Sequence, residues 1–179
     1  MKYVIRRLFM SYEKEEKWLN QMAQKGMHLV DYTFWRYLFE EGEPGEYIYR
    51  IELLKELPGH PESAAYLKFM EESGVEEVST YMRWVYFRKK ASEGSFEIYT
   101  DRKGKIKHAW RVISLIGVLC VLNFIIACYN LGLGVVVERY HFNAYFSIFN
   151  FTVGALLVPI LVSQLRIIIR QKRDMKIRE

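Results

Sequence analysis

The chain has 179 residues and a formal net charge of +5, a length that allows one domain, or one small domain with a membrane anchor. Residues 1–101 contain 14 Lys/Arg and 18 Asp/Glu, a net charge of −4, whereas residues 102–179 contain 12 and 3, a net charge of +9. Because the basic residues flank two apolar runs and the N-terminal part is mildly acidic, we expect no nucleic-acid partner.

The N-terminal part begins with a strand-like run, residues 2–10, which Arg6 and Arg7 make unlike a signal peptide. Residues 12–25 form an amphipathic pattern typical of a helix, with Ser11 suited to its start and Gly26 to its end. Alternating strand patterns follow at the ranges 27–32, 34–40, 46–54 and, near the end of this part, 96–101.

A duplication organises this part of the chain. Residues 18–41 align with residues 66–89 at an offset of 48, and the pairs include Leu19/Leu67, Met22/Met70, Gly26/Gly74, Val30/Val78 and Phe39/Phe87. Each unit reads strand–helix–strand–strand, with repeats at about 2–45 and 46–101. We therefore predict an α+β fold for the domain at 1–101, with a mostly antiparallel sheet and both helices on one face.

Two uncharged runs of about 20 residues, 112–134 and 144–165, predict two transmembrane helices. A basic juxtamembrane linker precedes them at 102–111, a short outer loop joins them at 135–143, and a basic tail follows at 166–179. Positive charge on both outer flanks predicts that both termini lie in the cytoplasm, so we expect a two-pass membrane protein. The tail is either a membrane-surface helix or only a flank of the second span.

Two amides inside these runs, Asn123 and Asn150, are candidates for helix–helix contact within the hairpin or in a homodimer. A transport pathway is disfavoured, because neither run holds a charged residue and two helices cannot enclose a pore without oligomerising.

The sequence contains no recognisable catalytic, metal-binding or phosphate-binding motif. The four histidines, His28, His60, His108 and His141, show no metal-ligand spacing, and there is no phosphate loop or nucleophile elbow. We expect no enzyme, no metal and no cofactor. Most aromatic residues of the equivalent strands should be core, but an alternative is a cleft for an apolar or cationic small molecule. Its candidate ligand-binding residues are Trp35, Arg36, Tyr37, Arg83, Trp84 and Tyr86.

The segments "YEKEEKWLNQMAQKGMHL" (12–29) and "EPGEYIYR" (43–50) resemble the domain of unknown function family numbered 2812. The resemblance covers nearly the full length, although Met27 stands where that family often has an aromatic residue. It implies a bacterial membrane protein of a family often encoded beside PadR-type regulators, and no established activity. The layout is also similar to GyrI-like small-molecule-binding domains, at the level of fold analogy only.

We therefore expect a membrane-anchored regulatory or protein-interaction module, with a bilayer and either a protein partner or a second copy as its contacts. Two alternatives stay open: a small-molecule sensor for lipophilic compounds, and an accessory subunit of a transporter or envelope complex. The acidic stretch "EEGEPGEYIYR" (40–50) is interpreted as a hairpin turn rather than a catalytic site.

Overall fold

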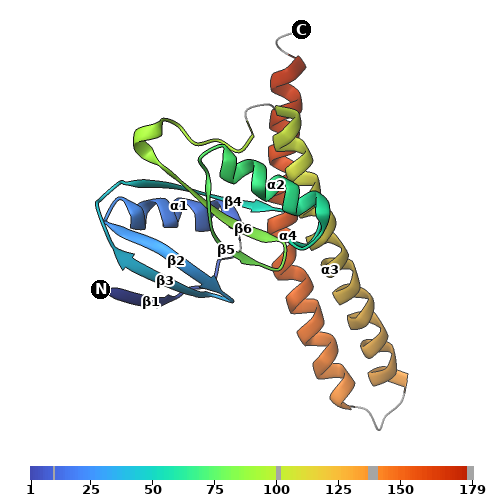
Figure 1. Cartoon of the computed structure of the whole chain (residues 1–179). Coiled ribbons are helices and arrows are strands. Elements are labelled where there is room, and N and C mark those ends of the chain that lie inside the picture. The colour runs from blue at the N-terminus through green and yellow to red at the C-terminus, as the bar shows by residue number, and fades with distance from the viewer. Residues whose placement is uncertain (10, 100–101, 137–140, 177–179) are drawn as a thin grey trace. The chain divides into compact units, whose positions relative to one another are not determined.

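The structure is a computed structural model that describes residues 1–9, 11–99, 102–136 and 141–176 (Figure 1). The chain divides into two compact units, Met1–Thr100 and Asp101–Glu179, which are described separately. The first unit is α+β and the second is a helical hairpin, so the predicted fold class is confirmed.

The first half of the α+β unit contains β1 (Lys2–Arg6), α1 (Tyr12–Ala23), β2 (Met27–Thr33) and β3 (Arg36–Glu41). These strands form an antiparallel sheet in the order β1-β3-β2. Ser11 caps α1, because its side chain accepts a hydrogen bond from the Lys14 backbone N–H. Trp18, Leu19 and Ala23 on one face of α1 are buried, as the helical period predicts.

The second half repeats this order with β4 (Tyr47–Leu53), α2 (Pro61–Glu72), β5 (Glu76–Tyr81) and β6 (Trp84–Lys90). Its antiparallel sheet has the equivalent order β4-β6-β5. A short 3₁₀ turn, η1 (Ala91–Glu93), follows β6.

Local irregularities recur at the offset of 48 residues. The register of β2 shifts between Leu29 and Asp31, and that of β5 shifts between Glu77 and Ser79. Gly26 and Gly74, which follow α1 and α2, have φ values of +75° and +79°. The β2–β3 and β5–β6 turns also contain residues with positive φ at equivalent positions, Phe34 and Met82. The two halves therefore share bulges and turns as well as strand order.

The strands form two three-stranded sheets, where the sequence led us to expect one. The edge strands β2 and β5 meet through side chains: Ser79 Oγ donates to Asp31 Oδ1 over 3.0 Å and accepts from the Tyr32 N–H over 3.2 Å. The bulges explain the division, because an extra residue in each edge strand disrupts the regular ladder that would join them.

Helix α1 also covers β4, the other edge strand of the second sheet. Asn20 exchanges two hydrogen bonds with the Tyr49 backbone, of 2.9 and 3.0 Å, and Glu16 accepts from the Ile51 N–H over 3.0 Å. Side chains of the first half thus satisfy the free backbone groups of β4, which would otherwise present an unpaired sheet edge.

The predicted strand at 96–101 is wrong where the structure describes it, because residues 96–99 form no strand; residues 100–101 lie outside the described residues. Phe96 is nonetheless buried in the second core cluster, and Ile98 packs against it. A further strand has no free edge of the second sheet to join, since α1 occupies β4 and β2 lies against β5.

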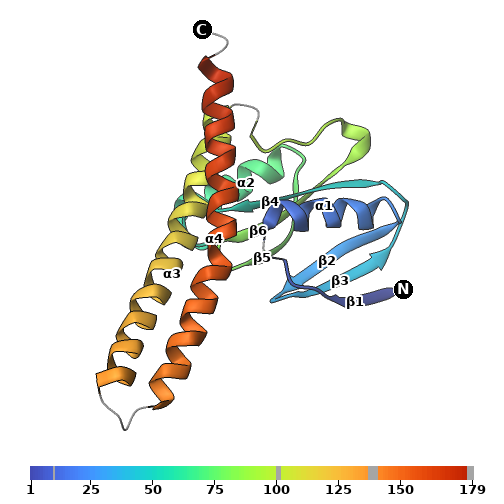
Figure 2. The ribbon, with the colours of Figure 1, turned by 180° about the vertical axis from the view of Figure 1, so that it is seen from behind.

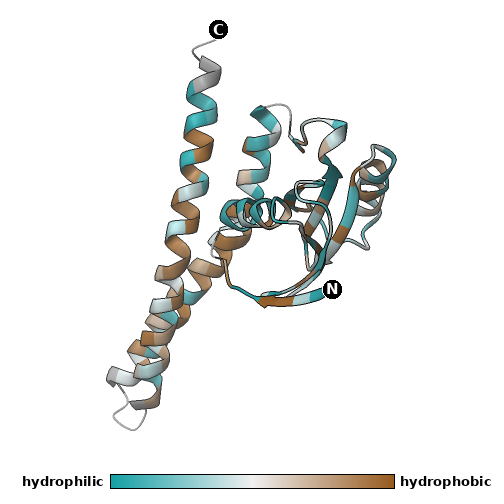
Figure 3. Ribbon diagram, turned by 90° about the vertical axis from the view of Figure 1, so that its left-hand side faces the viewer, coloured by the Kyte–Doolittle hydropathy of each residue, from teal (hydrophilic) through white to brown (hydrophobic). Residues whose placement is uncertain are grey.

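The second unit consists of α3 (Arg102–Val136) and α4 (His141–Lys176), which pack along each other (Figures 1 and 2). The expected linker at 102–111 forms the first turns of α3, and α4 continues through the described part of the tail. Of the expected outer loop, residues 137–140 lie outside the described residues, as do residues 177–179 of the tail and residue 10 of the strand-like run expected at 2–10. Apolar residues extend along both helices (Figure 3).

Candidate functional site

The six residues predicted to bind a ligand do not gather on one surface. Trp35 and Arg36 lie exposed at the β2–β3 turn, whereas Tyr37 and Tyr86 are 1% and 2% exposed in the core. The guanidinium of Arg83 donates to the carbonyls of Leu54 and Lys55, which ties the β5–β6 turn to the end of β4.

Trp84, the sixth of these residues, stacks on Tyr12 of α1 with a centroid distance of 5.6 Å. The set thus separates into an exposed turn, a structural arginine, two buried tyrosines and the partly buried Trp84. Ligand binding by these six residues stays a prediction.

The two buried tyrosines of this set contact Glu15, a residue that the sequence did not single out. The hydroxyls of Tyr37 on β3 and Tyr86 on β6 each donate to Glu15 Oε1 over 2.7 Å. Tyr32 stacks against both tyrosines, with centroid distances of 4.8 and 4.5 Å. One carboxylate of α1 therefore connects the central strands of the two sheets, and we name Glu15, Tyr37 and Tyr86 the carboxylate clamp.

Burial raises the pKa of Glu15 above its ordinary value of 4.5, although the two tyrosine hydroxyls act in the opposite direction. Burial likewise raises the pKa of Tyr37 and of Tyr86. A second buried carboxylate, Glu52 of β4, accepts hydrogen bonds from the hydroxyls of Tyr66 and Tyr99. Since both carboxylates lie in packed core, the arrangement is suited to holding elements together.

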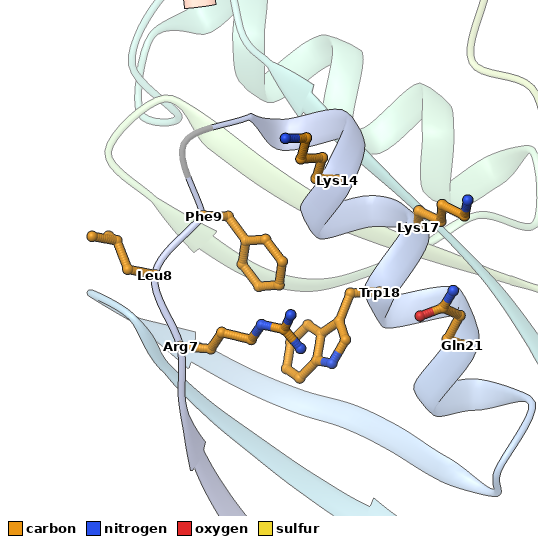
Figure 4. A pocket seen from close by; sticks show the side chains of 7 residues that line it. All are labelled: Arg7, Leu8, Phe9, Lys14, Lys17, Trp18 and Gln21. Atoms are coloured by element: carbon orange, nitrogen blue, oxygen red, sulfur yellow. The ribbon is translucent and has the colours of Figure 1, made fainter. Parts of the chain in front are cut away.

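An open groove of about 450 Å³ lies between α1 and the segment that connects it to β1 (Figure 4). Two aromatic rings form its floor, Phe9 and Trp18, with centroids 5.2 Å apart. The guanidinium of Arg7 lies over both rings, 4.8 Å from the centroid of Phe9 and 5.3 Å from that of Trp18. The remaining lining residues are Leu8, Lys14, Lys17 and Gln21.

The charge of this groove is unbalanced. Arg7, Lys14 and Lys17 are exposed, and no carboxylate in the described part of the chain forms a salt bridge with them. In the second half the positions of Lys14 and Lys17 are taken by Glu62 and Ala65. The basic groove is therefore particular to the first half. Its three cations, of which Arg7 lies over two aromatic rings, suit an anionic group with an apolar portion.

A second depression, of about 520 Å³, has the opposite character. Its lining includes three carboxylates beside Lys68, and the complete lining is Pro58, Ala64, Leu67, Lys68, Glu71, Glu76 and Glu77. The guanidinium of Arg88 binds Glu76 through two hydrogen bonds of 2.7 and 2.8 Å, which neutralises part of this charge. Among the described residues no group of three His, Cys, Asp or Glu is placed to hold a metal ion.

The stretch 40–50 closes the end of the first sheet. The Gly42 N–H donates to the Gly26 carbonyl, and the Gly45 N–H donates to the Ala23 carbonyl at the end of α1. His28 is buried beneath it with Nε2 3.5 Å from a carboxylate oxygen of Glu46, and a Cβ at Gly42 would lie 2.3 Å from the His28 ring. The acidic stretch is therefore a glycine-dependent turn, as predicted, but the predicted hairpin is wrong, because β3 and β4 belong to different sheets and do not pair.

In the helical unit the two predicted contact amides bond their own helices. Asn123 Nδ2 donates to the Leu119 carbonyl and Asn150 Nδ2 to the Phe146 carbonyl, both over 2.8 Å. Between the helices, Cys120 Sγ donates to the Gly154 carbonyl over 3.5 Å. A Cβ at Gly154 would lie 3.1 Å from the ring of Phe124, so close packing here depends on glycine.

Both helices are long and apolar enough to cross a membrane, with candidate spans at Arg102–Gly134 and Phe142–Arg173. Only 17% of the most apolar window of each helix is buried inside the protein, so the remaining apolar surface requires another apolar environment.

Comparison with known proteins identifies the family of the chain. No curated protein and no solved structure is significantly similar to the chain. The family described as "Protein of unknown function (DUF2812)" matches residues 11–121, which include most of the α+β unit and the first half of α3. The match covers well over half of the chain and confirms the resemblance seen in its motifs: the protein belongs to the DUF2812 family.

Proposed function

We propose that the protein is a non-enzymatic regulatory module, anchored in the bacterial plasma membrane by α3 and α4, that recognises a partner protein through its α+β unit. The observation that carries this proposal is the basic groove, in which Arg7, Lys14 and Lys17 surround the aromatic floor without a salt-bridging carboxylate among the described residues. Unneutralised cations beside the partly buried ring of Phe9 favour an acidic segment with apolar side chains as the ligand.

The anchorage and its orientation are part of the proposal. Basic residues stand before the apolar run of α3, among them Lys103, Lys105 and Lys107, and after that of α4, among them Arg166 and Arg170. This distribution supports a cytoplasmic location for both termini and for the α+β unit. A reporter fused after Glu179 should be active only on the cytoplasmic side, and activity of a periplasmic reporter at that site would overturn the orientation.

Photo-crosslinking tests the groove directly. The full chain would carry a photo-reactive amino acid at Gln21, which lines the groove, and crosslinked peptides would be identified by mass spectrometry. We expect attachment to an acidic segment of one partner, and loss of that product in the variant Lys14→Glu/Lys17→Glu. The matched control is Lys25→Glu, an exposed lysine just beyond the same helix. Identical products from all three chains would refute the proposal.

A small anionic amphiphile is the second candidate ligand, because a volume of about 450 Å³ is within the range of small-molecule sites. This form would make the protein a sensor of lipophilic compounds. A thermal-shift screen of fatty acids and other anionic amphiphiles separates the two. A compound that raises Tm in the wild type but not in Lys14→Glu/Lys17→Glu supports the sensor function. A screen in which no compound raises Tm favours the partner protein as the ligand of the groove. If the crosslinked partner is a transporter or an envelope enzyme, the protein is its accessory subunit.

A further inference from the structure

Two turns of the α+β unit expose large apolar side chains. Phe34 and Trp35 form the β2–β3 turn and are 53% and 43% exposed; Met82, in the β5–β6 turn, is 70% exposed. The ring of Phe34 lies 4.0 Å from that of Trp35 and 6.1 Å from that of Tyr81, measured between centroids. The two turns therefore lie close together, and we name Phe34, Trp35 and Met82 the apolar tips.

The backbone at the apolar tips is strained. Phe34, Trp35 and Met82 have φ values of +31°, +55° and +55°, in a region that residues other than glycine rarely adopt. Tight turns of this kind normally carry Asn, Asp or Gly. Bulky apolar side chains here add backbone strain and remain largely exposed, so packing within the unit does not account for them. Strain of this type is characteristic of positions that serve an external contact.

Basic residues adjoin the apolar tips. Arg36 follows Trp35 and is paired in register with Arg6 of β1, and the Arg7 N–H donates to the Trp35 carbonyl over 2.9 Å. All three arginines are exposed, as is Leu8, and none forms a salt bridge with a described carboxylate. Aromatic and apolar side chains bordered by arginine are the combination that enters the headgroup region of an anionic bilayer.

The chain itself keeps a bilayer nearby. The α+β unit is followed by α3, whose apolar run begins at Val112, ten residues after the helix starts at Arg102. At 1.5 Å per residue the helical segment between them spans about 15 Å. A surface tethered at this range meets the membrane at high effective concentration, so a few inserted side chains are sufficient for contact.

We propose that the apolar tips enter the headgroup region of the anionic bilayer in which the chain is anchored, with Arg6 and Arg36 on its phosphates. The proposal rests on the membrane anchorage stated under the proposed function and is independent of what the basic groove binds.

Spin-label accessibility tests it in the full chain. Cys120 and Cys128 are replaced by alanine, and a nitroxide is attached at Phe34→Cys or, separately, Met82→Cys in nanodiscs of three parts phosphatidylcholine to one part phosphatidylglycerol. Reference labels are placed at Glu43→Cys, on the exposed β3–β4 turn, and Leu122→Cys, within α3. The label at 122 should be accessible to oxygen and protected from a water-soluble nickel relaxant, and the label at 43 should show the reverse. We expect the oxygen-to-nickel accessibility ratio at positions 34 and 82 to lie between these two references, as it does for a label at the depth of the headgroups.

The outcomes separate the alternatives. If the labels at positions 34 and 82 are as accessible to nickel as the label at 43, and the label at 122 is protected, the lipid contact is overturned and the anchorage stands. A label at 122 that is exposed to water overturns the anchorage itself. Labels at 34 and 82 that both reagents fail to reach indicate a protein contact and refute the lipid one. Arg6→Glu/Arg36→Glu should raise nickel accessibility at 82 several-fold, and the control Lys90→Glu, an exposed lysine at the end of β6, should leave it unchanged.

Discussion

The carboxylate clamp should contribute strongly to the stability of the α+β unit, and Tyr86→Phe is the cleanest way to weaken it. This substitution removes the hydroxyl that donates to Glu15 Oε1 over 2.7 Å and keeps the ring that stacks 4.5 Å from Tyr32. A hydrogen bond to a charged group contributes about 1.5–3 kcal/mol. For a unit of about 100 residues, a loss of about 2 kcal/mol lowers Tm by about 8–16 °C.

The assay is thermal unfolding of the full chain in detergent micelles, combined with hydrogen exchange of the α1 amides, which reports the α+β unit alone. Tyr3→Phe is the matched control, because Tyr3 Oη also donates to a glutamate, Glu41 Oε1, over 2.6 Å, but at an exposed site. We expect no measurable change from the control. Tyr37→Phe/Tyr86→Phe should cost more than the sum of the single variants, since it leaves the Glu15 carboxylate buried without either hydroxyl. Equal, negligible shifts for Tyr86→Phe and Tyr3→Phe would refute the reasoning.

Two further predictions concern the same unit. Burial raises the pKa of Glu15 above 4.5, so the folded state binds more protons than the unfolded state, and stability should fall as pH rises from about 4.5 through the folded pKa. The Tm of Glu15→Gln, measured from pH 4 to 8, should therefore fall less steeply than the Tm of the wild type. Parallel curves would contradict this. Gly26→Ala should lower the free energy of unfolding, measured with denaturant, by about 2 kcal/mol or more, because φ is +75° and the new Cβ would lie 2.6 Å from the Gly42 carbonyl oxygen. The control Gly59→Ala, whose Cβ would have no atom within 4 Å, should change it by less than about 0.5 kcal/mol. Similar losses of stability in both variants would show that the turn does not need glycine.

Local periodicity was sufficient to predict α1, the strands at 27–32, 34–40 and 46–54, and the two apolar helices. The helical face of Trp18 and Leu19 is a short-range pattern, and burial follows it directly. In β4 the predicted alternation holds for the buried Tyr49 and Ile51 but fails at Glu52, which is also buried. The division into two sheets was not predictable in this way, because it depends on bulges at Leu29/Asp31 and Glu77/Ser79 that leave no signature in hydropathy.

The sites were harder to predict than the fold. Glu15 and Tyr86 are 71 positions apart, and a glutamate in the charged segment 12–17 looks solvated until the second sheet is placed beneath it. The basic groove joins Arg7 and Phe9, from a connection, to Lys14 and Lys17, whose spacing alone indicates only an exposed helix face. Both the carboxylate clamp and the basic groove are made by residues from separate segments, and no local sequence pattern shows that these segments come into contact.

The way α1 seals β4 also bears on how the unit is made during synthesis. Asn20 and Glu16 form hydrogen bonds with backbone groups of Tyr49 and Ile51, about 30 residues later in the chain. Glu15 accepts a hydrogen bond from Tyr86, which is synthesised later still. The first half therefore leaves the ribosome with these polar side chains unmatched, and it completes its structure only after β6 has emerged. We infer that neither repeat is an autonomous folding unit, in spite of their shared topology. The pair folds as one cooperative body, with the slow, non-local closure that such connections impose.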